Sequence, residues 1–400
     1  SAVAPEQPAR PTVLLPTCSY EEALSLARKS IALVDRGQTR SATARSIRSE
    51  RGQCVTTTSP RSGAGSDTLM YVFNFENNDG FSVIAANRAV DPVLAVAEKG
   101  NYTYGEPTGV ENFDFYMDAM AQSLAVIKPP KFDTIRTTPK FKTVEVNESR
   151  SCDPLIPVRW GQESPYGDYC SNGYSGCVAT AIAQIMAYYR FPASITTTYT
   201  DAPHAGETIA LNWTSIISYP YVYQVPALMR EIGQRVEMTY HPIDENDMET
   251  GSSAFSYMAP DCLISFGYSC ASGLASYEIA SIRTNLDETH PVYVRANDIS
   301  EGGHAWIADG YIYSRIGTEY YEEILIDNGL TLYYDYILTN STVQTTNLVH
   351  YNWGWDGSCD GYFAPGNGVA SGNGYIFDGL QMITSIRLPR IDSNLNHDFL

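Results

Sequence analysis

The charged side chains of this 400-residue chain fall into two unequal blocks, and this division constrains its fold more than any other feature. Residues 1–150 hold 17 acidic and 17 basic side chains and are neutral overall. Residues 151–400 hold 28 acidic and 9 basic side chains, and all nine are arginines because the last lysine is Lys142. Two separately folded units account for this change better than one continuous domain. We therefore expect domains at 1–150 and 151–400, joined near Glu145–Asp153.

The overall composition excludes several classes of protein. Hydrophobic residues make up 44% of the chain and aromatic residues 12%, which is enough to form a core and excludes a disordered chain. No run of about 18 apolar residues occurs, so we expect no membrane span. The net charge of −19 argues against nucleic acid as a partner. The eight cysteines include no CxxC pair, so we expect neither a zinc site nor any other metal or cofactor.

The first half predicts a small α+β unit. Ser19 as a cap and apolar residues at helical spacing predict a helix at 19–36. An arginine-rich loop at 37–68 then offers targets for trypsin-like proteases. The sequence next predicts two strands that join in a hairpin at Asn77–Gly80, a third strand, a helix and a polar linker; their ranges are 70–75, 81–85, 92–97, 111–126 and 131–150.

The second half predicts helices first and strands afterwards. Helical patterns occupy 177–190, 225–239 and 275–287. Short alternating runs of apolar residues then predict strands at 291–296, 304–314, 321–327, 331–338 and 347–353. This order is typical of an α+β domain with a helical half, a sheet half and a cleft between them.

The segment around Cys177 carries the strongest chemical signal. Apolar side chains from Val178 onward mark one face of a buried helix, Ser175 is a candidate cap, and Gly176 allows a tight turn into the helix. Cys177 then lies in the first turn, where the helix dipole favours a thiolate. A buried structural cysteine fits the same segment, so the helix alone does not decide between the two.

Two further segments favour a nucleophile. Gly302-Gly303-His304 begins an alternating strand, where a histidine can project into a cleft, although a structural histidine also fits. His350 to Trp355 end another strand, where Asn352 can orient an imidazole. Trp353 and Trp355 can shield an ion pair from water, and two core tryptophans also fit. A cysteine nucleophile, a base and an orienting group are what thiol catalysis needs. Gln162, fifteen residues before Cys177, supplies a donor for the oxyanion, with the backbone N–H of Cys177 as the second donor.

Four motifs in this order resemble the streptopain family of bacterial cysteine proteases, within the papain-like superfamily. They are Trp160-Gly-Gln162 with Pro165-Tyr166, Gly176-Cys-Val-Ala-Thr-Ala181 with Ala183-Gln-Ile-Met186, Gly302-Gly-His-Ala305 and Asn352-Trp-Gly-Trp355. The first half is similar to the propeptide of that family at Tyr71-Val-Phe-Asn74 and Gly80-Phe-Ser-Val-Ile84.

The resemblance implies an α+β, papain-like, two-lobed catalytic domain at 151–400 behind an inhibitory propeptide at 1–150. It implies a secreted endopeptidase that acts on protein or peptide substrates with a hydrophobic side chain at P2. By the same resemblance Cys177 is the nucleophile, His304 the base and Gln162 the oxyanion donor. The third catalytic position stays open between Asn352 and Trp353. The Gly366–Gly374 stretch resembles a mobile loop beside the cleft, and a surface turn without a role also fits.

The proenzyme hypothesis includes activation by a cut near Arg150 or Lys142, made by the enzyme itself or by another protease. Two ways of blocking the cleft stay open, namely displacement of His304 and coverage of Cys177. No signal peptide is visible at Ser1, so we expect one to have been removed. A transglutaminase-like acyltransferase and a catalytically silent surface-binding protein are the alternatives. The acidic residues Asp244–Asp247 fit a solvated turn better than a calcium site.

Overall fold

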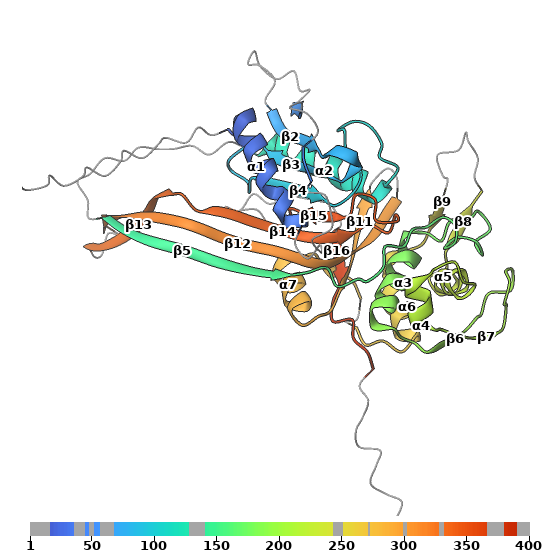
Figure 1. Ribbon diagram of the computed structural model, residues 1–400. Helices are drawn as coiled ribbons and strands as arrows, with labels where there is room; N and C mark the ends of the chain where they lie inside the picture. The colour runs from blue at the N-terminus through green and yellow to red at the C-terminus, as the bar shows by residue number, and fades with distance from the viewer. Residues whose placement is uncertain are drawn as a thin grey trace, which may run out of the picture.

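A computed structural model shows an N-terminal unit lying on a long β-sheet, with a helical lobe to one side (Figure 1). We name the described residues up to 127 the N-terminal unit and those from 141 the C-terminal unit. The structure describes residues 17–35, 45–47, 52–56, 68–127, 141–242, 251–270, 273–298, 302–327, 332–365 and 380–389. No helix in these ranges is both long and apolar enough to cross a bilayer.

The N-terminal unit is the predicted α+β unit. The cap of its first helix is confirmed, because the N–H of Glu22 donates to Ser19 Oγ at 3.2 Å and the N–H of Ser19 donates to Glu22 Oε2 at 2.8 Å. The predicted hairpin is also confirmed, with Phe81 paired to Asn74 and a turn in which Asn77 and Asn78 have positive φ. Its elements are α1 (Tyr20–Val34), β1 (Gln53–Thr56), β2 (Thr68–Asn74), β3 (Phe81–Ala85), β4 (Val93–Ala97) and α2 (Glu111–Val126).

The helical lobe follows Cys152. Its two longest helices were predicted, and the other two were missed because six or seven residues are too few to show a helical period. The helices are α3 (Cys177–Tyr189), α4 (Trp213–Ser218), α5 (Gln224–Arg235) and α6 (Ala259–Ser265). Two small hairpins complete the lobe, one of β6 (Ser194–Thr196) with β7 (Thr208–Ala210) and one of β8 (Thr239–His241) with β9 (Gly251–Ser253).

The remaining strands form the sheet half. β12 runs unbroken from Gly302 to Asp327, where the sequence predicted two strands, because its polar middle is solvated but still paired with β5 and β14. The other elements are β10 (Ala275–Ser276), α7 (Ile279–Asp287), β11 (Val292–Asp298), β13 (Leu332–Ser341), β14 (Gln344–Asn352), β15 (Gly361–Phe363) and β16 (Gln381–Ile383).

One sheet joins the two units. In the described residues it contains twelve strands, whose main path is β1-β2-β3-β4-β15-β14-β12-β11-β16-β10. Within this sheet, the two units meet where β4 pairs antiparallel with β15. The sequence predicted two units, but not that they would share a sheet.

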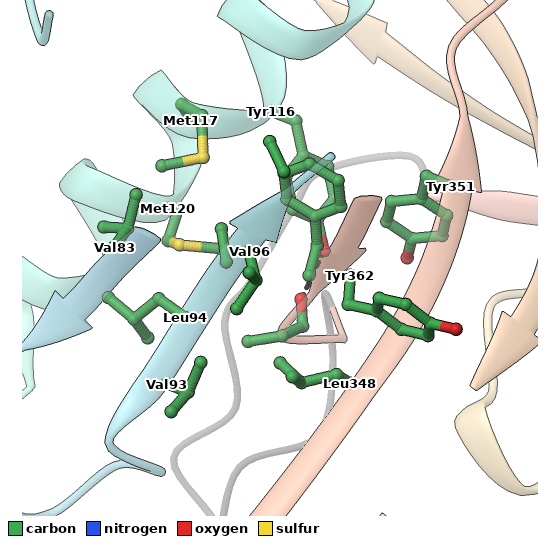
Figure 2. Close-up of a cluster of buried hydrophobic side chains, with 14 of the residues drawn as sticks. Val83, Val93, Leu94, Val96, Tyr116, Met117, Met120, Leu348, Tyr351 and Tyr362 are labelled. Atoms are coloured by element: carbon green, nitrogen blue, oxygen red, sulfur yellow. Dashed lines mark hydrogen bonds between the residues drawn. The ribbon is translucent and has the colours of Figure 1, made fainter. Parts of the chain in front are cut away.

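Alternation along the strands divides the core in two. Trp306 and Ala308 of β12 face a core that includes α2, whereas Ala305 and Ile307 face the core of the helical lobe. Figure 2 shows the first core, where Met117 and Met120 of α2 pack with side chains from both units. The N-terminal unit therefore covers one face of the C-terminal sheet.

The predicted linker is wrong over its second half. Residues Phe141–Cys152 form β5, which pairs with β12 from Cys152↔Tyr311 to Phe141↔Glu322 (Figure 1). The segment is polar, which predicted a linker, but an exposed edge strand needs backbone partners more than it needs apolar side chains. The first half of the predicted linker lies outside the described residues, as does most of the 37–68 loop.

Candidate active site

The turn into α3 presents Cys177 as the first residue of the helix. Gly176 precedes it with φ 85°, a backbone conformation that favours glycine. The predicted Ser175 cap is wrong, because the Ser175 hydroxyl instead contacts Thr180 Oγ1 at 3.0 Å. The first N–H groups of a helix have no hydrogen-bond acceptor within that helix, so the Cys177 N–H can donate to an anion.

Gln162 is held next to this turn. The backbone N–H of Ser175 donates to the carbonyl oxygen of Gln162 at 2.9 Å, which closes the loop between the two residues. Gln162 is 7% exposed. The structure therefore brings the buried residue Gln162 close to the N-terminus of α3.

Cys177 lies beside the backbone of β12, in surroundings that disfavour its thiolate. Although the residue as a whole is only half-buried, burial of its sulfur raises the pKa to about 11. A hydrogen bond from the backbone of Ala305 opposes this rise, whereas the negative charge of Glu111 adds to it. The helix start predicted a lowered pKa, but in the form described here the pKa is raised, because desolvation outweighs the backbone hydrogen bonds that lower it.

His304 follows Gly303 in β12 and is 9% exposed. The ring of Phe115 lies 5.5 Å from its imidazole, centre to centre. Since Phe115 belongs to α2, the N-terminal unit covers the proposed base. Residues 304 and 305 are neighbours in one strand, so the backbone beside the Cys177 sulfur lies directly next to His304, whose side chain faces Phe115 of α2.

The first turn of α2 also reaches the backbone of this site. The side chain of Asn112 donates from Nδ2 to the carbonyl of Ala305 at 2.7 Å and to that of Trp353 at 3.1 Å. Asn112 is 1% exposed, so these are buried hydrogen bonds between the two units. Asn112, Phe115 and the charge of Glu111 thus converge on the proposed catalytic residues.

Asn352 is engaged in a different network. Its Nδ2 donates to Val158 O and Gln184 Oε1, both at 3.1 Å, and its Oδ1 accepts from Gln184 Nε2 at 3.0 Å. The N–H of Gly354 also donates to Asn352 Oδ1 at 3.1 Å. These bonds tie the end of β14 to α3 and occupy the amide.

Trp353 is fully buried beneath α2. Its Nε1 donates to the carbonyl of Cys359 at 2.9 Å, and its ring centre lies 5.6 Å from that of Tyr116. The ring centre of Trp306 lies 5.3 Å from that of Trp353. The indole therefore forms part of the core shared by the two units.

Sequence analysis missed Asn112 and Gln184. Both are polar residues on the buried face of a helix, at positions where the pattern calls for apolar side chains, and that conflict is the signal that was available. Two predicted features lie outside the described residues, namely the Gly366–Gly374 stretch and Asp244–Asp247. All eight cysteines lie in the described residues, and none of them forms a disulfide.

Comparison with known proteins decides the family. The model of the Peptidase C10 family matches residues 160–363, a range that contains Gln162, Cys177, His304, Asn352 and Trp353. This chain belongs to the Peptidase C10 family. A second model, Spi protease inhibitor, matches residues 16–124 and thus the N-terminal unit.

Individual relatives agree with this assignment. Streptopain of Streptococcus pyogenes is 24% identical over 367 residues, covering 78% of this chain and 80% of its own. The thiol protease/hemagglutinin PrtT of Porphyromonas gingivalis is 25% identical over 77% of this chain and 36% of its own. Among solved structures, Prevotella intermedia prointerpain A has 21% identity and a TM-score of 0.49, covering 83% of this chain and 98% of that one.

The chain is therefore a cysteine endopeptidase in its proenzyme form, with an N-terminal unit that resembles a protease inhibitor. The predicted α+β fold and the streptopain resemblance are confirmed.

Proposed function

We propose that Cys177 is the nucleophile of this peptidase, that His304 is its base, and that the N-terminal unit is a propeptide whose removal activates the enzyme. The observation that carries the proposal is the convergence at β12, where the sulfur of Cys177 lies beside Ala305 and the N-terminal unit covers His304 with Phe115.

In the proposed reaction the Cys177 thiolate adds to the scissile carbonyl. The oxyanion takes hydrogen bonds from the Cys177 N–H and the Gln162 side chain. The imidazolium of His304 then protonates the amine as the C–N bond breaks, leaving a thioester. Water adds to the thioester while His304 takes its proton, and collapse releases the carboxylic acid and restores the thiolate.

The same geometry supports a mechanism of latency. A thiol with a pKa of about 11 is protonated at neutral pH and is a poor nucleophile. Asn112 and Phe115 occupy the position beside β12 that a substrate backbone would need. Removal of α2 would hydrate the sulfur, take away the charge of Glu111 and open access to His304.

Of the two positions considered for the third catalytic residue, Trp353 has the better support for a shielding role. It lies in the core beneath α2, whereas the Asn352 amide is committed to Gln184 and the backbone. Asn352 and Gln184 then act together as a brace between β14 and α3. A Gln184→Ala variant should lower kcat through this brace and leave the reactivity of Cys177 toward iodoacetamide unchanged.

We propose that processing occurs closer to Lys142 than to Arg150. Arg150 is paired with Tyr313 inside β5 and also forms an ion pair with Asp287. A protease binds its substrate as a free extended segment, so a residue within the ladder is protected until the strand opens. Lys142 is also paired, with Tyr321, but it is the second residue of β5 and becomes accessible when that end of the strand frays. The 1–150 and 151–400 boundary should accordingly shift toward residue 140, which leaves β5 in the mature enzyme.

Substrates are proposed to be proteins or peptides with an apolar side chain at P2. Met238 supports this preference, because its thioether packs against Gly176, next to the nucleophile. Peptides that differ only in leucine or aspartate at P2 would test it through kcat/KM. We also propose that the enzyme acts outside the cytoplasm, which immunodetection in culture supernatant and cell fractions would check.

The deciding experiment is a time course of the full-length chain with a thiol reductant, followed on gels and with casein as substrate, beside Cys177→Ala. We expect conversion to a species of roughly 250 residues with casein activity, and neither change in the variant. Activity that persists in Cys177→Ala would overturn the assignment of the nucleophile. If the intact chain stays silent, trypsin is added to both proteins, and activity restricted to the wild type would place activation in trans.

A further inference from the structure

The two units meet at a strand edge that lies away from Cys177. Ala95, Val96 and Ala97 of β4 pair with Phe363, Tyr362 and Gly361 of β15. The ladder extends past both ends of this pairing, since the N–H of Ala364 donates to Leu94 O and the N–H of Glu98 donates to Asp360 O, each at 2.7 Å. The C-terminal unit thus receives a complete added strand.

Gly361 makes the close approach of this strand possible. A Cβ on Gly361 would lie 2.2 Å from the carbonyl oxygen of Val96 and 2.6 Å from Ala97 Cα, which are both backbone atoms. No side chain fits there while β4 is docked. A glycine in a strand is a mark of such close backbone approach.

A charged cluster lies at the end of the added strand. Glu98 is the first residue after β4, and its carboxylate forms an ion pair with Arg159 and lies 3.4 Å from His350 Nε2. On the C-terminal side, His350 Nδ1 contacts Asp309 at 2.6 Å, and Arg159 contacts Asp360 at 3.2 Å. Two side chains of one unit, each also paired with a carboxylate of that unit, therefore hold a carboxylate that belongs to the other.

The charged cluster is largely shielded from water, so the loss of the Glu98 carboxylate would be costly. The side chains of Asp309, Asp360 and His350 are at most 2% exposed and that of Glu98 is 14% exposed, while Arg159 remains 46% exposed. Withdrawal of Glu98 removes one of the two charged partners of His350 and one of the two of Arg159. A buried charge that loses its partner is costly.

We propose that β15, Arg159 and His350 form a docking site for a β-strand that carries a carboxylate directly after its paired residues. The ligand in this protein is the strand β4 with Glu98. Through this site the propeptide stays bound after the linker between the units has been cut, so that cutting alone does not release it. The inference rests on the proposed function in one respect, namely that maturation cuts the chain between the two units.

The test measures retention of the propeptide after a controlled cut. All proteins carry Cys177→Ala, so self-processing plays no part, and each has a recognition sequence for a site-specific protease inserted after Thr138. After cleavage, the dissociation of the two fragments is followed by size-exclusion chromatography over a dilution series. Glu98→Gln is compared with Glu106→Gln, which alters an exposed glutamate of the same unit.

We expect the cut parent and Glu106→Gln to co-elute as a complex, and Glu98→Gln to bind its propeptide more weakly by about 30-fold or more. Retention of Glu98→Gln within twofold of Glu106→Gln would overturn the role of the carboxylate. Immediate release of the propeptide from the cut parent would overturn the proposal as a whole.

A second variant guards against a Glu98→Gln protein that does not fold. Gly361→Ala changes the C-terminal unit and places a methyl group against the backbone of β4, so it should also weaken retention. Normal retention by Gly361→Ala would contradict strand addition at β15. Because every readout uses the Cys177→Ala background, these results do not depend on which residues perform catalysis.

Discussion

The N-terminal unit meets the catalytic unit in two regions of different chemistry. At the cleft, α2 offers an aromatic ring and an amide to His304, Ala305 and Trp353. At the sheet edge, β4 offers a backbone ladder, and Glu98 enters a dry charged cluster. The first region covers the proposed catalytic groups, and the second binds mainly backbone and charge. Inhibition and attachment are therefore separate tasks in this protein, and each can be altered without the other.

The largest expected effect is on catalysis alone and leaves both contact regions between the units intact. Gln162→Ala should lower kcat by about 10²–10³, because one of two oxyanion donors is lost. Retention of the propeptide should stay unchanged, since Gln162 contacts Ser175 within the catalytic unit. Initial rates of the matured variant on a peptide substrate, with active sites titrated by a thiol reagent, would measure this. Full activity in Gln162→Ala would refute the oxyanion assignment.

The next prediction weakens the cleft region alone. Asn112→Ala removes the donor for the carbonyls of Ala305 and Trp353 and leaves both buried without it, which costs about 1–3 kcal/mol. The proenzyme should then convert to the mature form faster, by up to about 100-fold. Conversion half-times on gels would show this, with Gln122→Ala on the exposed face of α2 as the matched control. Equal half-times would mean that Asn112 does not hold the inhibited state.

A smaller effect concerns pH and the sheet-edge region. Burial alone would raise the pKa of Glu98, but His350 and Arg159 lower it to about 2 from its ordinary 4.5. Its stabilising contribution is therefore present above about pH 4.5 and is lost as the pH falls through about 2. Burial alone would lower the pKa of His350, but Asp309 and Glu98 raise it to about 10 from 6.5. That contribution is present below about pH 6.5 and is lost as the pH rises through about 10.

Asp360 acts in the opposite sense, since burial raises its pKa to about 6 against the charge of Arg159, and its protonation relieves a cost as the pH falls. On balance we expect the melting temperature of the Cys177→Ala proenzyme to be highest between about pH 4.5 and 6.5. The acid limb should flatten in Glu98→Gln, which scanning fluorimetry from pH 3 to pH 10 would show. Parallel curves for the two proteins would remove Glu98 from the account.

The smallest effect is one of position. Keeping β5 in the mature enzyme predicts a mature N-terminus before Lys142 or close to it, and N-terminal sequencing would decide. An N-terminus at or after Arg150 would mean that β5 leaves β12 before the cut. In that case β5 detaches during maturation and exposes the edge of β12. The N-terminal unit would then be held to the C-terminal unit less strongly than the β15 contact alone implies.

The sequence by itself determined the local elements and the family. Helical spacing specified α1, α2 and α3, the Asn-Asp-Gly turn specified the hairpin, and four short motifs in order indicated the peptidase. These features depend on neighbouring residues, whose backbone preferences and periodicity act over one or two turns. The polar segment of β5 misled the same reasoning, because an edge strand takes its stability from backbone partners that lie far away in the sequence.

Only the tertiary structure decided how the two units are joined and what the site looks like while they are joined. The pKa of Cys177 rises because its sulfur is buried and the charge of Glu111 in α2 adds to the shift, although its place at a helix start favours the opposite shift. Glu98 was one glutamate among many in the sequence, and it became a docking group because Arg159, His350 and Asp309 meet around it. Burial and charge pairing are properties of residues brought together from distant parts of the chain, and no local pattern contains them.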